Sequence, residues 1–201
     1  MSRAVVWDVG NVLIRWDPRA VWREDFADEA ALDAFMDETG FDAWNLEQDR
    51  GRSWADAVEA QRRAHPAHVH HYEKFARDWH RAVPGEIPGS VAILDAMRTA
   101  GVPLYAVTNF SGEKWAETRA RFPFLAESFR DVVVSAHERV VKPDPAIFRV
   151  LLDRNGLDPA ACLFIDDSPR NTEAARALGM DAIRFAGPEA LATDLAARGL
   201  A

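Results

Sequence analysis

From Gly85 onward the sequence alternates short apolar runs with longer amphipathic segments. Apolar, β-branched runs bounded by turn residues are typical of buried strands, and strands that alternate with helices form β-α-β units with a parallel sheet. This pattern therefore predicts an α/β fold. The strands expected in this region lie at residues 104–108, 132–134, 162–165 and 182–185.

The helices expected between these strands have clear start signals. Asp144 and Pro145 open one helix, and Ser168 and Pro169 open another. Asp and Ser side chains accept hydrogen bonds from the free N–H groups of a first turn, and Pro suits the first helical position. A glycine, Gly156 or Gly179, closes each helix.

Residues 17–84 are different in kind, because helical spacing such as Trp22 to Phe26 continues without any strand pattern. We expect several short helices here, inserted between a first strand and the rest of the sheet as a small cap domain. The core domain then comprises residues 1–16 and 85–201. The Trp and Phe stripes of the insertion are expected to form the cap's own core.

Composition excludes several classes of protein. A net charge of -8 argues against sequence-independent nucleic-acid binding, which needs Lys and Arg to neutralise phosphates. The single cysteine, Cys162, excludes a disulfide framework within the chain. Neither a signal peptide nor an apolar run of the roughly 20 residues that span a bilayer is found, so we expect a cytoplasmic, soluble protein without a membrane partner.

Asp8 follows the apolar run Ala4-Val5-Val6-Trp7 and precedes Gly10 and Asn11. Open α/β sheets present their chemistry at the carboxyl ends of their strands, which is where this carboxylate is expected. Asp8 is therefore a candidate nucleophile, and the alternative is an acidic cap of the strand end.

Other polar groups follow the later strands. Thr108 and Asn109 offer a hydroxyl and an amide that can bind an oxyanion, or they form a simple turn. Lys142 is one of only three lysines, and it precedes a helix start; its alternative is a solvated loop residue. Asp166 and Asp167 repel each other, which favours a divalent cation such as Mg²⁺ over a helix-capping acid pair.

These segments resemble the four ordered motifs of the haloacid dehalogenase-like (HAD) hydrolase superfamily, which implies a Rossmann-like core with an inserted α-helical cap. The insertion resembles the branch with a small helical cap, which includes sugar-phosphate phosphatases. The motifs are Asp8-Val9-Gly10-Asn11-Val12, Thr108-Asn109, Lys142-Pro143 and Asp166-Asp167.

The resemblance implies that Asp8 attacks a phosphate monoester and forms an aspartyl-phosphate that water hydrolyses. It also implies Mg²⁺ held by Asp8, the carbonyl of Gly10, Asp166 and Asp167, the last directly or through water. The substrate is expected to be a small phosphorylated metabolite, with sugar phosphates as the default class.

For the remaining site residues, the resemblance implies contacts with the phosphoryl group. Lys142 is expected to offset negative charge, while Thr108 and the amide of Asn109 donate hydrogen bonds.

One position departs from the phosphatase pattern. Many phosphatases of this superfamily have a second aspartate two residues after the nucleophile, where this chain has Gly10. That aspartate protonates the leaving group and later activates water, and glycine can do neither. Asp17, His137 and the cap histidines are conceivable substitutes, and the sequence selects none of them.

Three other functions stay open. A 2-haloacid dehalogenase would use the aspartate without metal, but the paired Asp166 and Asp167 favour phosphoryl transfer. A phosphonate-cleaving relative would need a cap lysine, for which only Lys74 is present. A weakly catalytic protein that binds a phosphorylated metabolite would fit the loss of the acid-base group at Gly10.

The cap leaves further questions open. The histidines of residues 65–71 lack a fixed zinc-ligand spacing, so an exposed cluster is favoured over a metal site. The aromatic content of the cap leaves room for a homodimer contact. Several residues near the turn at Gly51 are candidates for substrate contacts without an assigned role, namely Trp44, Asn45, Arg50, Arg52 and Trp54.

Overall fold

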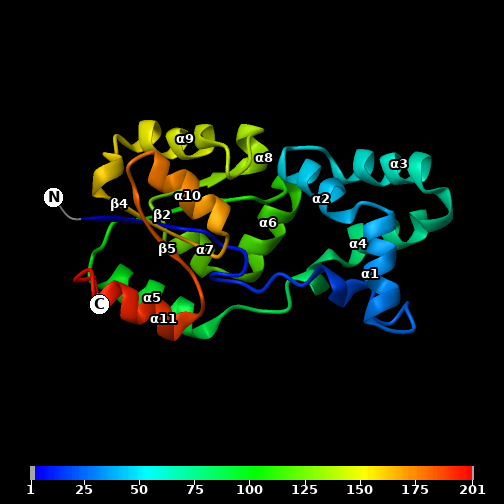
Figure 1. The fold of residues 1–201 in the computed structure, drawn as a ribbon, viewed down its shortest axis with the longest axis horizontal. Coiled ribbons are helices and arrows are strands. Elements are labelled where there is room, and N and C mark those ends of the chain that lie inside the picture. The colour runs from blue at the N-terminus through cyan, green and yellow to red at the C-terminus, as the bar shows by residue number, and fades with distance from the viewer. Residues whose placement is uncertain (1–2, 201) are drawn as a thin grey trace.

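A five-stranded parallel sheet forms the centre of the structure, a computed structural model that describes residues 3–200 (Figure 1). Its order is β3-β2-β1-β4-β5, so the first strand lies in the middle. The prediction of an α/β fold with a parallel sheet is therefore confirmed. The strands are β1 (Ala4–Trp7), β2 (Leu104–Thr108), β3 (Asp131–Val134), β4 (Cys162–Asp166) and β5 (Asp181–Arg184).

The two sides of β1 receive different parts of the chain. Strand β2 pairs with one edge of β1 and β4 with the other, with Trp7 aligned to Ala106 and Ile165. The chain order reverses at this point, and ligands of open α/β sheets bind in the crevice at such a reversal. The carboxyl ends of β1, β2 and β4 therefore define where a site is expected.

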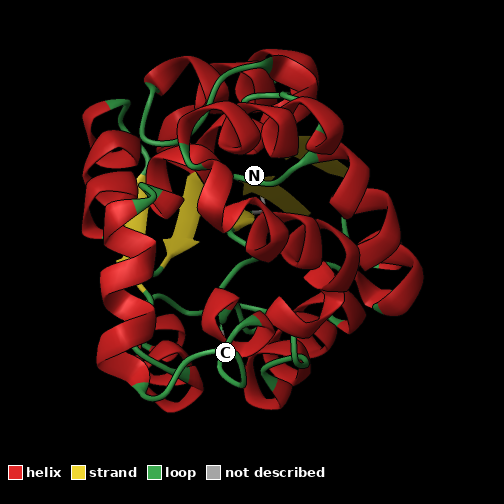
Figure 2. Cartoon of the chain, turned by 90° about the vertical axis from the view of Figure 1, so that its right-hand side faces the viewer, coloured by secondary structure: helices red, strands yellow, loops and turns green. Residues whose placement is uncertain are grey.

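Helices cover both faces of the sheet (Figures 1 and 2). Alternate residues of a strand point to opposite faces, so Trp7 packs in one cluster with Leu94 and Leu191, and Val6 in another with Phe148. The helices that follow the insertion are α5 (Pro88–Thr99), α6 (Gly112–Arg121), α7 (Phe124–Glu127), α8 (Ser135–Glu138), α9 (Pro145–Asn155), η4 (Pro159–Ala161), α10 (Pro169–Ala177) and α11 (Pro188–Ala196).

The segment between β1 and α5 is helical, as predicted, and lies to one side of the sheet (Figure 1). Its aromatic side chains bury one another: Trp22 has its ring centroid 4.7 Å from that of Phe75, and Trp44 lies 4.6 Å from Tyr72. These contacts confirm that the aromatic stripes form a core. The helices are η1 (Pro18–Val21), α1 (Glu29–Glu38), α2 (Phe41–Asp49), α3 (Trp54–Ala64), η2 (Pro66–His68), α4 (Val69–Asp78) and η3 (Trp79–Ala82).

Of the two predicted helix N-caps, one is confirmed and the other differs in detail. Asp144 does cap α9, because its side chain accepts a hydrogen bond from the N–H of Ala146 at 2.9 Å. Ser168 occupies the N-cap position of α10, but its side chain makes no capping bond. The N–H of Ser168 instead donates to the carboxylate of Asp166 at 2.8 Å, so this turn is organised around the acid.

Within residues 3–200, no helix is both long enough and apolar enough to cross a membrane.

Candidate active site

A buried ion triad lies at the carboxyl ends of the central strands. The Nζ atom of Lys142 is 2.7 Å from Oδ1 of Asp8 and 2.7 Å from Oδ2 of Asp166. All three residues are nearly inaccessible, with exposed fractions of 3%, 7% and 0% in that order. The structure thus brings together three predicted site residues, of which Asp8 lies more than a hundred positions before the other two.

The backbone at the two strand ends orients the carboxylates. The N–H of Asp8 donates to the carbonyl of Ile165 in β4 at 2.8 Å, which continues the sheet pairing past the end of β1. Oδ1 of Asp8 accepts from the N–H of Val9 at 2.7 Å. Asp166 accepts from Asn171 Nδ2 at 3.0 and 3.1 Å. Each acid is therefore fixed before any ligand arrives.

Asn109 fixes the loop that carries Lys142. Its side chain donates to the carbonyl of Lys142 at 3.1 Å and accepts from the N–H of the same residue at 2.8 Å. Thr108, the last residue of β2, is 1% exposed and pairs with Val134 of β3. The structure places both residues at the predicted strand end, while their contacts with a phosphoryl group stay predictions.

A cluster of three carboxylates suits a hard divalent cation. Oxygen atoms of Asp8, Asp166 and Asp167 all lie within 4.8 Å of one another, and this is the one such group found among residues 3–200. Mg²⁺ prefers oxygen ligands and uses one or two carboxylates with substrate phosphates. Gly10, whose carbonyl is the further predicted ligand, lies two residues beyond Asp8 in the wall of the adjoining pocket.

The pKa values of the clustered groups indicate that the site favours additional positive charge. Burial, opposed by the Lys142 ammonium and reinforced by Asp166, raises the pKa of Asp8 to about 7. Burial and the neighbouring Asp166 also raise the pKa of Asp167 above its usual range. Burial alone would lower the pKa of Lys142, but Asp166 and Asp8 outweigh it and raise that pKa. One lysine therefore does not fully neutralise three acids.

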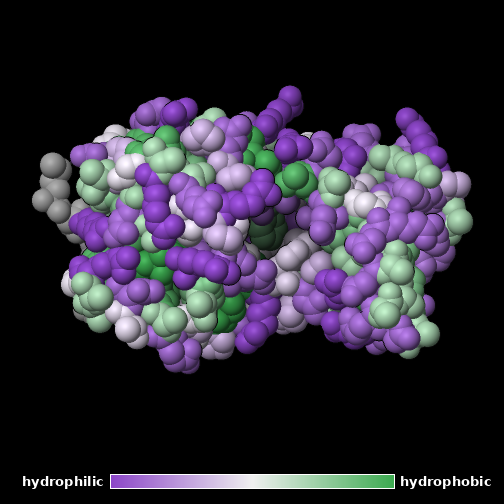
Figure 3. All heavy atoms as spheres, viewed as in Figure 1, coloured by the Kyte–Doolittle hydropathy of each residue, from purple (hydrophilic) through white to green (hydrophobic). Residues whose placement is uncertain are grey.

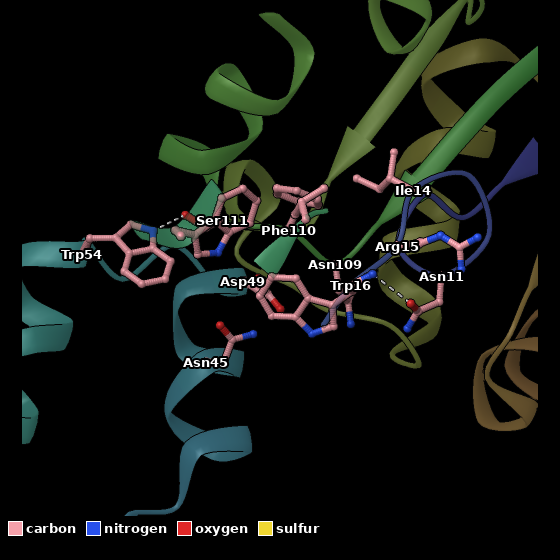
Figure 4. Close-up of a pocket in the computed structure, with 13 residues that line it drawn as sticks. Asn11, Ile14, Arg15, Trp16, Asn45, Asp49, Trp54, Asn109, Phe110 and Ser111 are labelled. Carbon is pink, nitrogen blue, oxygen red and sulfur yellow. Dashed lines mark hydrogen bonds between the residues drawn. The ribbon is translucent and has the colours of Figure 1, made fainter. Parts of the chain in front are cut away.

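A pocket of about 200 Å³ opens beside this cluster, and Figure 3 shows a hollow between the sheet region and helices α1–α4. Its wall combines residues from the strand ends with residues from the helical insertion (Figure 4). A ligand there would contact both parts of the chain. The lining residues are Gly10, Asn11, Ile14, Arg15, Trp16, Asn45, Asp49, Trp54, Trp79, Val83, Asn109, Phe110 and Ser111.

Asp49 is an acidic residue of the pocket wall that sequence reasoning missed. It ends α2, and Asn45 lies one turn earlier on the same side of that helix (Figure 4). Burial, partly offset by Lys142, raises the pKa of Asp49 to about 7. The four-residue spacing of Asn45 and Asp49 just before Gly51 is the signal that could have indicated a polar face turned toward a ligand.

The raised pKa of Asp49 predicts a pH-dependent effect on stability. Because folding favours the protonated carboxyl, the wild-type protein loses stability as the pH rises from 3.8 through about 7, and Asp49→Asn lacks this loss. Because Asp49 is only half-buried, solvent screens part of this penalty. We therefore expect the stability advantage of Asp49→Asn to grow by about 1 to 2 kcal/mol between pH 5 and pH 8. Urea unfolding of both metal-free proteins at each pH measures it, and an unchanged difference would contradict the burial of this charge.

The other candidate acid-base groups are engaged elsewhere. Asp17 pairs with Arg23 at 3.2 Å, and His137 of α8 lies against Gly112 of α6. His68 lies 3.6 Å from Glu38, and His71 lies 3.6 Å from Asp25. None of these histidines belongs to the carboxylate cluster described above, and none of these residues lines the pocket.

The unassigned residues near Gly51 divide into two groups. Asn45 and Trp54 line the pocket, and Nε1 of Trp54 donates to Oγ of Ser111 at 2.8 Å. Arg52 instead binds the C-terminal part of α2, since its side chain donates a hydrogen bond to the side chain of Gln48 at 2.7 Å. The remaining two have no place in the pocket wall: Trp44 is buried among aromatic rings, and Arg50 pairs with Glu47.

A family model described as haloacid dehalogenase-like hydrolase matches residues 2–179. The match covers most of the chain, so this protein belongs to the haloacid dehalogenase-like hydrolase family, and the resemblance inferred from the four motifs is confirmed.

Individual relatives match shorter stretches. Phosphoglycolate phosphatase of Rhodospirillum rubrum is 34% identical over 96 residues, which are 48% of this chain and 39% of that protein. The matched segments cover 11 to 46% of the length of the curated relatives, so the chain spans less than half of each.

Solved structures share the fold. A HAD family enzyme from Bacteroides thetaiotaomicron aligns with a TM-score of 0.71 at 21% identity, covering 90% of this chain and 92% of that chain. That enzyme also has a structure in complex with magnesium and inorganic phosphate. L-2-haloacid dehalogenase from Xanthobacter autotrophicus aligns with a TM-score of 0.63 at 19% identity, over 100% of this chain and 85% of that chain.

Proposed function

We propose that this protein is a magnesium-dependent phosphatase that hydrolyses a small phosphate monoester through an aspartyl-phosphate on Asp8. The observation that carries the proposal is the buried cluster of Asp8, Lys142 and Asp166 at the carboxyl ends of adjacent strands. The similarity to phosphoglycolate phosphatase and to other proteins named as phosphatases supports the reaction class.

In the proposed reaction, a carboxylate oxygen of Asp8 attacks phosphorus in line with the leaving oxygen. The Lys142 ammonium, already within 2.7 Å of Asp8, offsets the charge of the nucleophile and of the incoming phosphoryl oxygens. The hydroxyl of Thr108 and the amide of Asn109 donate hydrogen bonds to those oxygens. Thr108 is held in β2, and the side chain of Asn109 holds the backbone of Lys142, so these residues lose little freedom when the substrate binds.

Asp8, Asp166, Asp167 and the carbonyl of Gly10 would hold the magnesium ion. When bound, the ion supplies positive charge that brings the anionic nucleophile and the anionic phosphoryl group together. The three clustered carboxylates and the raised pKa values of Asp8 and Asp167 fit such a cation.

Residues 17–84 form the cap domain in this proposal, over a core of residues 1–16 and 85–201. The pocket wall contributed by Asn45, Asp49 and Trp54 would contact the leaving group, because the strand ends reach only the phosphoryl group. The cap therefore selects the substrate among phosphorylated metabolites such as sugar phosphates.

Dehalogenation is the weaker alternative. The likeness to a haloacid dehalogenase extends over the whole chain, but it is a likeness of fold. Displacement of halide from a haloacid calls for no metal ion, whereas Asp166 and Asp167 add two acids beside the nucleophile. Paired acids would repel a carboxylate substrate and favour a cation with a phosphate ester.

Magnesium dependence tests the proposed function. We expect phosphate release from a panel of sugar phosphates, 2-phosphoglycolate and 4-nitrophenyl phosphate with Mg²⁺, and loss of that release in EDTA. Asp166→Asn should need at least about tenfold more Mg²⁺ for half-maximal rate, since altered ligation typically costs ten- to a hundredfold in affinity. Halide release from 2-chloropropionate without Mg²⁺, and no phosphate release from any ester, would contradict the proposal.

A further inference from the structure

Asp49 is an acidic residue that the helical insertion contributes to the pocket wall. It lines the same cavity as Gly10 and Asn109, and Figure 4 shows it at the end of α2. Its carboxyl makes no hydrogen bond among the residues that the structure describes, in contrast to Asp8 and Asp166. A half-buried acid that is not engaged in an ion pair faces the space where the leaving group of an ester would lie.

The position of Asp49 is fixed by the sheet region and not only by its own helix. The carbonyl of Asp49 accepts a hydrogen bond from Oγ of Ser135 at 2.6 Å, and Ser135 is fully buried. The same Oγ accepts from the N–H of Phe110 at 2.9 Å, directly after the end of β2. One hydroxyl thus ties the end of α2 to the strand end beside the site.

A second contact reinforces this attachment. Gly51 has a φ of +99° and approaches α8 so closely that an added Cβ would lie 2.9 Å from the carbonyl of Ala136. Only glycine tolerates both the dihedral angle and the approach. The turn at residues 49–51 therefore sits directly on α8, which keeps the carboxyl of Asp49 at the pocket.

We propose that Asp49 is the general acid and base of the reaction and replaces the aspartate that this chain lacks at Gly10. The inference builds on the proposed phosphatase function and assigns one of its missing groups. A carboxyl kept protonated near neutral pH can donate a proton to a leaving oxygen, and the raised pKa of Asp49 is consistent with that state.

The proton and electron movements balance over two steps. As Asp8 attacks phosphorus, the bond to the leaving oxygen breaks, and that oxygen takes the proton of Asp49 to leave as an alcohol. A water oxygen then attacks phosphorus of the aspartyl-phosphate while Asp49 accepts the water proton. The bond between Asp8 and phosphorus breaks, which gives inorganic phosphate and restores both carboxyl groups.

Leaving-group dependence tests this assignment. Phenyl phosphate and 4-nitrophenyl phosphate share a ring, but phenolate is the poorer leaving group and needs protonation more. For Asp49→Asn we expect kcat/KM to fall by about a hundredfold or more with phenyl phosphate and by less than about tenfold with 4-nitrophenyl phosphate. Its kcat should fall with both esters, and a burst of nitrophenolate should precede the slow steady state.

Two further variants complete the experiment. Gly10→Asp should restore phenyl phosphate hydrolysis to the Asp49→Asn protein, because an added Cβ at Gly10 meets no atom within 4 Å. Glu47→Gln is the matched control, since Glu47 lies on the same helix but pairs with Arg50 on the surface. It should leave both esters unchanged.

Equal losses of kcat/KM with the two esters, or no loss of kcat/KM with either, would overturn the role of Asp49 while leaving the phosphatase function in place. Absence of phosphate release from every ester in the wild-type protein would overturn both proposals together.

Discussion

Asp8→Asn should reduce phosphate release by about 10⁶-fold, the size of effect known for removal of the nucleophile in an enzyme that uses covalent catalysis. The amide has the size of the carboxylate but cannot form the acyl phosphate, so the loss should appear with every ester, whatever its leaving group. Steady-state phosphate release in saturating Mg²⁺, with 4-nitrophenyl phosphate as the most reactive ester, measures it.

The control for this variant is Asp95→Asn, at an exposed acid of α5 that pairs with Arg98 far from the strand ends. It should retain wild-type activity. The variant Asp8→Asn should also keep its circular dichroism spectrum, because the N–H of Val9 can still donate to the remaining side-chain oxygen. Activity of Asp8→Asn within about tenfold of the wild type would rule out Asp8 as the nucleophile.

Lys142→Met should lower the free energy of unfolding of the metal-free protein by about 3 to 5 kcal/mol. Methionine keeps most of the length and shape of the side chain, but Asp8 and Asp166 lose their buried counter-charge. Removing one partner from a buried ion pair leaves an uncompensated charge, which is the costly case. Urea unfolding with and without Mg²⁺ measures the effect, and Mg²⁺ should recover part of the lost stability.

A second buried lysine offers the matched control. Lys114 is 8% exposed, but its partner Glu117 is largely in solvent. Lys114→Met should therefore cost less than about 1 kcal/mol, because a carboxylate in water needs no counter-ion. Similar stability losses in the two variants would show that the charge at Lys142 is not the cause.

The sheet and the carboxylate cluster could be predicted because each depends on local sequence. Strand β4 is a continuous apolar run that ends in Asp166. The last residue of a parallel strand lies at the carboxyl edge of the sheet, so the position of Asp166 follows from the strand alone. Once Asp8 ends a second parallel strand, both carboxylates must meet at the same edge. Strands β3 and β5 begin one residue earlier than the sequence predicts, because Asp131 and Asp181 extend the pairing despite their polarity.

The place of Asp49 in the pocket could not be predicted, because it depends on contacts between distant segments. The hydrogen bond of its carbonyl with Ser135, 86 positions later, and the close approach of Gly51 to α8 hold Asp49 at the site. In the local sequence, only the four-residue spacing from Asn45 distinguishes Asp49 from the exposed acid Asp42 of the same helix. Asp17 and His137, which the sequence offers as acid-base groups, can transfer protons but do not line the pocket.

Trapping the covalent intermediate tests the central claim most directly. The wild-type protein is mixed with 4-nitrophenyl phosphate and Mg²⁺, quenched in acid during turnover, digested and analysed by mass spectrometry. We expect one added phosphoryl group on the peptide that contains Asp8, with fragment ions that place it on that residue, and no such adduct in Asp8→Asn. Steady turnover without any phosphorylated peptide, or an adduct on another residue, would contradict the account.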